Sequence, residues 1–150
     1  MIDYATSRLS RDVFVIGHQQ ITREWFARRA KAYDLFVSRI VVDEASRGDM
    51  EAVRERAALL RGIPLLGVTD TATQLASRLI ESRAVPRKAT EDAFHIAVAA
   101  VHGVDYLLTW NCKHIANAAM RQAIERVCRE AGCEPPVICT PEELMDDEPA

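Results

Sequence analysis

The chain has 150 residues, of which 49% are hydrophobic and 27% are charged, and its formal net charge is −3. This composition is typical of a folded globular protein, and we expect residues 1–150 to form one domain that ends in an acidic tail at 146–150. No apolar run reaches the roughly 18 residues that cross a bilayer, so we expect no membrane span. The first residues, MIDYATSRLSRD, lack the apolar core of a secretory signal, which favours a cytoplasmic location.

The net charge gives no indication of a nucleic-acid-binding surface, and the cysteine spacing argues against a structural zinc site. A net charge of −3 does not indicate a nucleic-acid-binding surface, and local basic clusters such as 23–31 are more often solvated helix faces. Of the four cysteines, only Cys128 and Cys133 have a spacing typical of zinc sites. Because no second pair accompanies them, we expect reduced thiols rather than a structural zinc ion.

The first element of the chain has two interpretations. Within residues 11–26, RDVFVIGHQQITREWF, the segment DVFVIG read by itself predicts a short strand followed by a turn. The alternative is one helix that continues through HQQITREWFARRAK and would place Val13 and Ile16 on one stripe; it rests on the family resemblance given below.

Strands and helices then alternate along the chain. Short apolar runs bounded by turn or capping residues predict strands at 35–38, 64–68, 104–108 and 136–139. Helical patterns lie between these runs and follow the candidate N-caps Asp49, Asp70, Thr90 and Asn117. The sequence TPEEL, from Thr140, predicts a capping box with Glu143. This alternation is typical of an α/β fold with a parallel sheet covered by helices on both faces.

The helix predicted at residues 90–102 is apolar nearly all round, so we expect it to be buried. It nevertheless carries Asp92 and His95, which share one face at the i, i+3 spacing. An acid in a first helical turn complements the helix dipole, and this is the plainest explanation of Asp92. However, the next strand ends at Thr109 and Asn111, and functional groups of parallel sheets gather beyond the carboxyl ends of strands.

A second acid, Glu44, follows the first predicted strand in the segment VVDEA and could meet Asp92 over the sheet. Two carboxylates in a partly dry crevice repel each other unless a cation lies between them. Oxygen ligands with retained waters suit Mg²⁺ or Mn²⁺ better than zinc. We therefore predict Glu44 and Asp92 as metal ligands, with Thr109 and Asn111 completing the candidate catalytic set. We interpret His95 as a structural residue whose ring is hydrogen-bonded near Asp92 or to the backbone.

The segment EDAFHIAVAAVHGVDYLLTWNCKHIAN, residues 91–117, closely resembles the third-acid helix, following strand and fourth-site loop of PIN-domain proteins, which include the VapC-like toxin ribonucleases. VVDEA resembles the second-acid segment of that family, and PPVICTPEEL resembles its last strand and closing turn. The resemblance implies a three-layer α/β/α sandwich with a parallel sheet, and Mg²⁺- or Mn²⁺-dependent cleavage of RNA. By match, Glu44 takes the second-acid position, Asp92 the third, and Thr109 the threonine that opens the loop.

The sequence departs from the family pattern at two places. Asn111 stands where many members have another acid, and an amide contributes no negative charge. The family's first strand, which lies in mid-sheet and ends in Asp, has no match, because only Met1 and Ile2 precede Asp3. We therefore expect a sheet that lacks its N-terminal strand. The resemblance also favours the helix at residues 11–26, while the strand interpretation would fill the vacant place in the sheet.

Two functions follow from the resemblance. The first is a metal-dependent endoribonuclease of the PIN type, the toxin of a type II toxin–antitoxin pair, with activity weakened by the missing acid. It implies an RNA substrate, an antitoxin-type protein partner and a homodimer. The alternative is a non-catalytic PIN-like module that binds a protein partner or RNA.

Overall fold

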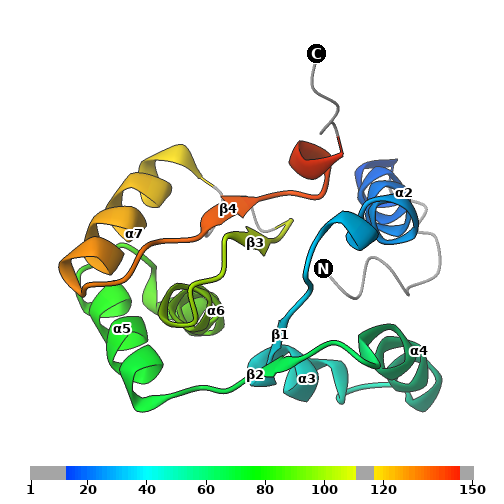
Figure 1. Ribbon diagram of the computed structural model, residues 1–150, viewed down its shortest axis with the longest axis horizontal. Helices are drawn as coiled ribbons and strands as arrows, with labels where there is room; N and C mark the ends of the chain where they lie inside the picture. Colours follow the sequence, from blue (N-terminus) through cyan, green and yellow to red (C-terminus); the bar gives the residue numbers. More distant parts are fainter. Residues whose placement is uncertain (1–12, 111–116, 146–150) are drawn as a thin grey trace.

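The computed structural model describes residues 13–110 and 117–145 (Figure 1). The α-helices are α2 (Val13–Arg28), α3 (Arg39–Ala45), α4 (Met50–Leu60), α5 (Asp70–Glu81), α6 (Thr90–Val101) and α7 (Ala118–Glu130). The strands are β1 (Val37–Ser38), β2 (Leu65–Leu66), β3 (Tyr106–Leu108) and β4 (Val137–Cys139). Short 3₁₀ turns are η1 (Ala30–Ala32), η2 (Arg87–Ala89) and η3 (Glu142–Leu144). The fold is of the predicted α/β class.

All strand pairing in the described residues is parallel, as predicted, but it is divided between two small sheets. β1 pairs with β2, with Val37 opposite Leu65, and β3 pairs with β4, with Tyr106 opposite Val137. Parallel neighbours need a crossover connection, and α3 with α4 supplies one for the first pair while α7 supplies the other. The expectation of one continuous sheet is not met in the described residues, because no ladder joins the two pairs.

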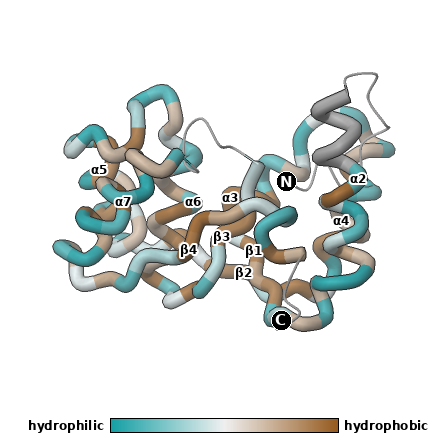
Figure 2. The backbone as a smooth tube through the Cα atoms, turned by 90° about the horizontal axis from the view of Figure 1, so that it is seen from above, coloured by the Kyte–Doolittle hydropathy of each residue, from teal (hydrophilic) through white to brown (hydrophobic). Residues whose placement is uncertain are grey.

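The core is built around α6, which lies in the middle of the molecule (Figure 1). Its small side chains Ala93 and Ala97 are completely buried, as is Ile96, and α5 packs against it through Leu75 and Leu79. Figure 2 shows hydrophobic residues concentrated in α6 and the strands, with hydrophilic residues on the outer sides of α5 and α7. The prediction that this helix is core is confirmed. Gly103, with a φ of +70°, then turns the chain from α6 towards β3.

A second apolar cluster joins α2 to the end of the chain. Trp25 packs with Cys139 and Leu144, and the partly buried Tyr33 and Leu35 complete the cluster. This packing uses α2 as a helix, so the interpretation of residues 11–26 as a helix is confirmed from Val13 onward. The local prediction of a strand at DVFVIG is wrong, because the helical periodicity of the longer segment and its packing outweigh the β-branched residues.

Three of the predicted helix caps are confirmed. Asp49 accepts a hydrogen bond from Ala52 N, and Asn117 accepts one from Ala119 N. Thr140 and Glu143 form the reciprocal hydrogen bonds of a capping box.

Two other cap predictions are wrong: the cap of α5 is the residue before the predicted one, and the predicted cap of α6 lies inside the helix. Thr69, not Asp70, caps α5 by accepting a hydrogen bond from Ala72 N at 3.1 Å. Thr90 lies inside α6, where its hydroxyl donates to the Arg87 carbonyl oxygen, and the helix follows directly from η2. Because the backbone of Thr90 is already helical, with φ of −57° and ψ of −41°, this residue does not occupy the N-cap position.

The cysteines that the structure describes form no disulfide, and the expectation that they bind no zinc ion stays a prediction. Cys128 and Cys139 are buried and Cys133 is partly buried. Burial raises the pKa of both Cys128 and Cys139 to about 11, so these two thiols stay protonated and unreactive at neutral pH. Among the helices of the described residues, none is long and apolar enough to cross a membrane.

Candidate active site

Glu44 lies on α3, the short helix that follows β1. Ser38, the last residue of β1, caps this helix by accepting a hydrogen bond from Val41 N at 3.3 Å. The cap starts α3 directly at the carboxyl end of the strand, and α3 then packs against α6. Glu44 Oε1 consequently lies 3.3 Å from His95 Nε2, with the two side chains 35% and 16% exposed.

The carboxyl group of Glu44 is strongly perturbed. Burial removes it from water, and a hydrogen bond and charge repulsion from Glu91 act in the same direction, so its pKa is raised from 4.5 to about 7. Arg47, which lies 3.9 Å from Glu91, opposes this shift. Near neutral pH the carboxyl group is therefore divided between its neutral and charged forms, and a cation beside it would favour the charged form.

His95 is perturbed in the opposite direction. Its burial lowers the pKa of the imidazole, and this outweighs the attraction of Asp92 and Glu91 for a proton. The ring is therefore neutral near pH 7 and shares a hydrogen bond with Glu44. The sequence-based interpretation expected His95 to bond near Asp92 or to the backbone, whereas its partner is Glu44, which is 51 residues away in the chain. In the sequence, the feature that marked His95 as a site residue was its spacing of three residues from Asp92 on a helix predicted to be buried.

Asp92 lies in the first turn of α6 and is partly exposed. It faces the same side of the helix as His95 and interacts with it electrostatically. α3 therefore brings Glu44 to His95, and Asp92 acts electrostatically on the same imidazole. The specific prediction that Glu44 and Asp92 bridge one metal ion stays a prediction.

Thr109 stands at the predicted place, directly after β3. Its N–H donates to the Cys139 carbonyl oxygen at 2.9 Å and so extends the pairing of β3 with β4. The next side chain, Trp110, donates from its indole to Thr22 Oγ1 on α2 at 2.7 Å. Thr109 therefore lies where the strand meets α2. Asn111, the fourth predicted site residue, and Asp3 lie outside the described residues.

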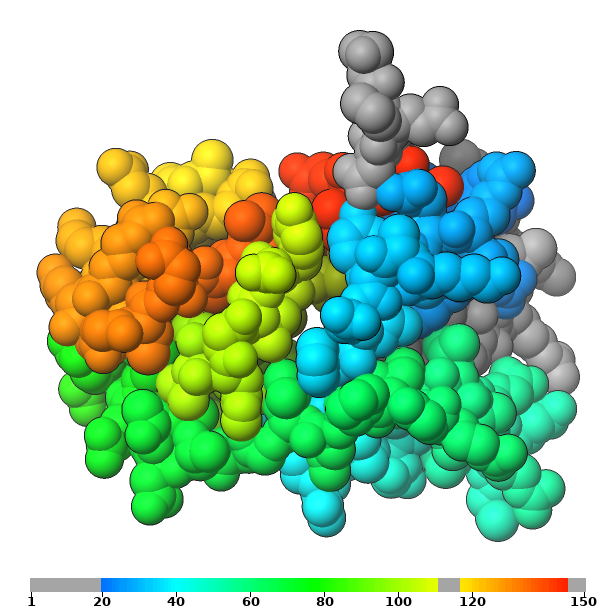
Figure 3. Space-filling view, in the orientation of Figure 1, coloured from blue at the N-terminus to red at the C-terminus, as the bar shows by residue number. Residues whose placement is uncertain are grey.

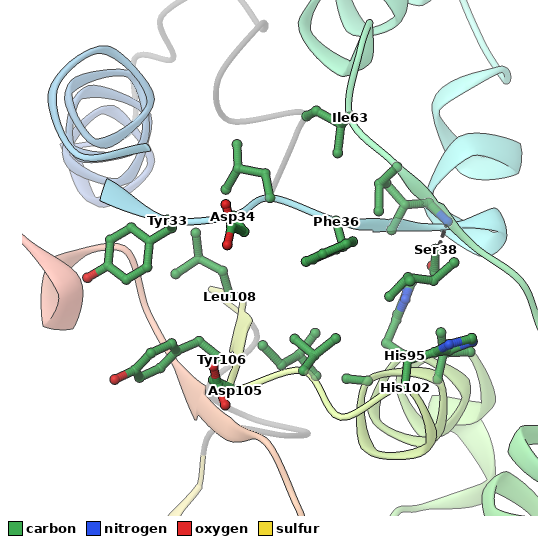
Figure 4. A pocket seen from close by; sticks show the side chains of 18 of the residues that line it. Tyr33, Asp34, Phe36, Ser38, Ile63, His95, His102, Asp105, Tyr106 and Leu108 are labelled. Atoms are coloured by element: carbon green, nitrogen blue, oxygen red, sulfur yellow. Dashed lines mark hydrogen bonds between the residues drawn. The ribbon is translucent and has the colours of Figure 1, made fainter. Parts of the chain in front are cut away.

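A cavity of about 580 Å³ lies between the two strand pairs. Figure 3 shows the segment that leads into β1 and the segment of β3 side by side at the surface. In Figure 4, His95 of α6 and His102, which follows that helix, lie at one end of the cavity, and Asp34, Tyr33, Asp105 and Tyr106 lie at the other. The rings of Tyr33 and Tyr106 meet edge to face at 6.0 Å, and Phe36 points into the middle. The Glu44–His95 pair thus adjoins a largely apolar hollow.

Glu44 and one neighbouring ligand could together hold a divalent cation. In residues 13–110 and 117–145, no group of three or more His, Cys, Asp or Glu side chains is arranged to hold a metal ion. Mg²⁺ usually keeps several waters and takes only one or two carboxylates from the protein, so a half-buried Glu44 with an adjacent donor is chemically sufficient for a weak site. The repulsion between Glu44 and Glu91 would be relieved by such an ion.

A family model described as PIN domain matches residues 13–127, which include Glu44, Asp92, Thr109 and Asn111. No curated protein and no solved structure matches the chain. A PIN domain indicates a nuclease-type function; such nucleases generally depend on a divalent metal ion and act on RNA or DNA. Since the matched region covers most of the 150 residues, from the start of α2 into α7, the chain belongs to the PIN domain family.

Proposed function

We propose that this PIN domain is a Mg²⁺- or Mn²⁺-dependent endoribonuclease whose site is built on Glu44 and Asp92. The observation that carries the proposal is the packing of α3 against α6, which brings Glu44 to the face of α6 that bears Asp92 and His95. A half-buried carboxyl group with a strongly raised pKa beside an open cavity is more typical of a functional site than of a structural ion pair.

Each residue has a role in this proposal. When bound, the divalent ion supplies Lewis acidity towards the scissile phosphate and an acidified water. Glu44 and Asp92 hold the ion, and Thr109 and Asn111 offer a hydroxyl and an amide that orient a water or a phosphate oxygen by hydrogen bonds. Arg47, exposed beside Glu91, is placed to attract the RNA backbone without reading its sequence.

The biological role that we propose is that of a VapC-like toxin in a type II toxin–antitoxin pair, acting in the cytoplasm as a homodimer that an antitoxin chain binds. The sequence resemblance supports this role. Large apolar side chains on the strands or next to them are exposed, among them Phe36, Leu65, Tyr106 and Val137, which are 45–57% exposed, and such surfaces favour association. Sedimentation velocity should therefore detect a dimer, and a monomer at every concentration would contradict this part of the proposal.

The nuclease proposal is tested with a fluorogenic RNA, in Mn²⁺ or Mg²⁺, against the wild-type chain and an Asp92→Asn variant. Asp105→Asn is the matched control, because Asp105 is an exposed acid at the other end of the cavity. We expect slow cleavage by the wild type, since two matched carboxylates bind the ion weakly. Asp92→Asn should abolish it and Asp105→Asn should preserve it. Cleavage that survives both Asp92→Asn and EDTA would refute the proposal.

A further inference from the structure

His95 and Glu44 are spaced as two ligands of one ion would be. Their facing atoms, Nε2 and Oε1, are 3.3 Å apart. Metal–nitrogen and metal–oxygen bonds of about 2.0–2.2 Å place adjacent ligand atoms about 3.0 Å apart at a right angle and about 3.4 Å apart at a tetrahedral angle. The observed separation lies between these values. An ion could therefore join the two atoms with little movement of either side chain.

The tertiary structure, rather than local flexibility, sets this spacing. Glu44 comes from α3 and His95 from α6, two helices that pack against each other. The His95 side chain is only 16% exposed, so its ring has little freedom to turn away. His102, the residue that follows α6, provides a contrast, because its Nε2 lies 2.8 Å from a backbone oxygen, the carbonyl of Gly67.

We propose that His95 is itself a ligand of the cation that Glu44 holds, and that this nitrogen ligand makes the site select Mn²⁺ or a later first-row metal ion over Mg²⁺. The inference rests on the proposed function, from which it takes Glu44 as a cation ligand. Imidazole nitrogen suits ions such as iron, nickel and zinc best, and the affinity of a site with a nitrogen ligand rises along the first-row series from Mn²⁺ onward, whereas Mg²⁺ prefers oxygen and retains its waters. His95 therefore determines which metal occupies the site, while the carboxylates attract divalent ions in general.

The test measures metal binding directly, without RNA. Mn²⁺ affinity is read by electron paramagnetic resonance and Mg²⁺ affinity by competition, for the wild-type chain, His95→Leu and the matched control His102→Leu. Because even the loss of an outer-shell partner costs about 10–100-fold in metal affinity, His95→Leu should weaken Mn²⁺ binding by about tenfold or more. Mg²⁺ binding should change much less, and His102→Leu should match the wild type. Equal losses for both ions, or no loss for either, would overturn the inference.

A second measurement uses the wild-type chain alone, so it stands even if His95→Leu fails to fold. Substoichiometric Mn²⁺ should broaden the ¹⁵N-labelled ring signals of His95 far more than those of His102. Similar broadening of both rings, or none, would count against ligation by His95.

The outcomes are also separable from those of the nuclease proposal. RNA cleavage with an unchanged preference between Mn²⁺ and Mg²⁺ in His95→Leu rejects only the ligand role, whereas Mn²⁺ binding through His95 without cleavage rejects only the nuclease.

Discussion

Replacing Glu44 by Gln should stabilise the protein at alkaline pH and leave it unchanged in acid. The carboxyl group has a pKa of about 7 in the folded protein, against 4.5 for an unperturbed glutamate. The folded state therefore binds more protons between these values, so the stability of the wild type falls as the pH rises from about 4.5 and the loss is complete above 7. Gln has the shape of the protonated acid and never ionises.

The magnitude follows from the same shift. At about 1.4 kcal/mol for each pH unit, the full difference corresponds to about 3 kcal/mol. The side chain of Glu44 is 35% exposed, and solvent screening at such a site reduces the expected gain to about 1–2 kcal/mol. Both proteins retain His95, whose lowered pKa acts in the opposite direction, so the comparison is made between the two proteins at each pH.

The assay is urea unfolding at pH 4 and pH 8 in EDTA, with Asp43→Asn as the control. Asp43 precedes Glu44 on α3 but is exposed and pairs with Arg39 at 3.3 Å, so its substitution should have a small effect at both pH values. Saturating Mn²⁺ should remove the advantage of Gln, because the ion stabilises the charged carboxylate. An equal loss of stability in Glu44→Gln at pH 4 and pH 8 would refute the reasoning, since it would show that the carboxyl group acts only through packing.

Two further predictions concern the scaffold that carries the site. Ala97→Leu should overpack the completely buried face of α6 and destabilise the protein by about 1–3 kcal/mol. In thermal unfolding the control Ala58→Leu, on the exposed side of α4, should be nearly neutral. If Ala97→Leu melts at the wild-type temperature, this face of α6 is not packed. Thr69→Ala should remove the N-cap of α5 and cost about 0.5–2 kcal/mol, measured by urea unfolding. Asp70→Asn, one residue later, should cost less, and the reverse order would contradict the assignment of the cap.

Much of the chain's local structure could be predicted from the sequence because it depends on neighbouring residues. The four strands that the structure describes lie within the predicted runs, since a short apolar run between turn residues has few other ways to be buried. Asp49 and Asn117 were recognisable as caps because each stands alone before its helix. At α5 the cap was misplaced, because Thr69 and Asp70 are both good capping residues and only the backbone conformation chooses between them.

The sequence by itself determined the α/β class, the buried helix α6 and the candidate acids Glu44 and Asp92, because periodicity and motif spacing are written locally along the chain. Only the tertiary structure decided that the strands form two separate pairs and that His95 is the partner of Glu44. The physical reason is that both the strand pairing and the His95–Glu44 contact depend on how segments far apart in the sequence pack together in the folded chain. The desolvation that moves the pKa values of Glu44 and His95 in opposite directions exists only after α3 has packed on α6.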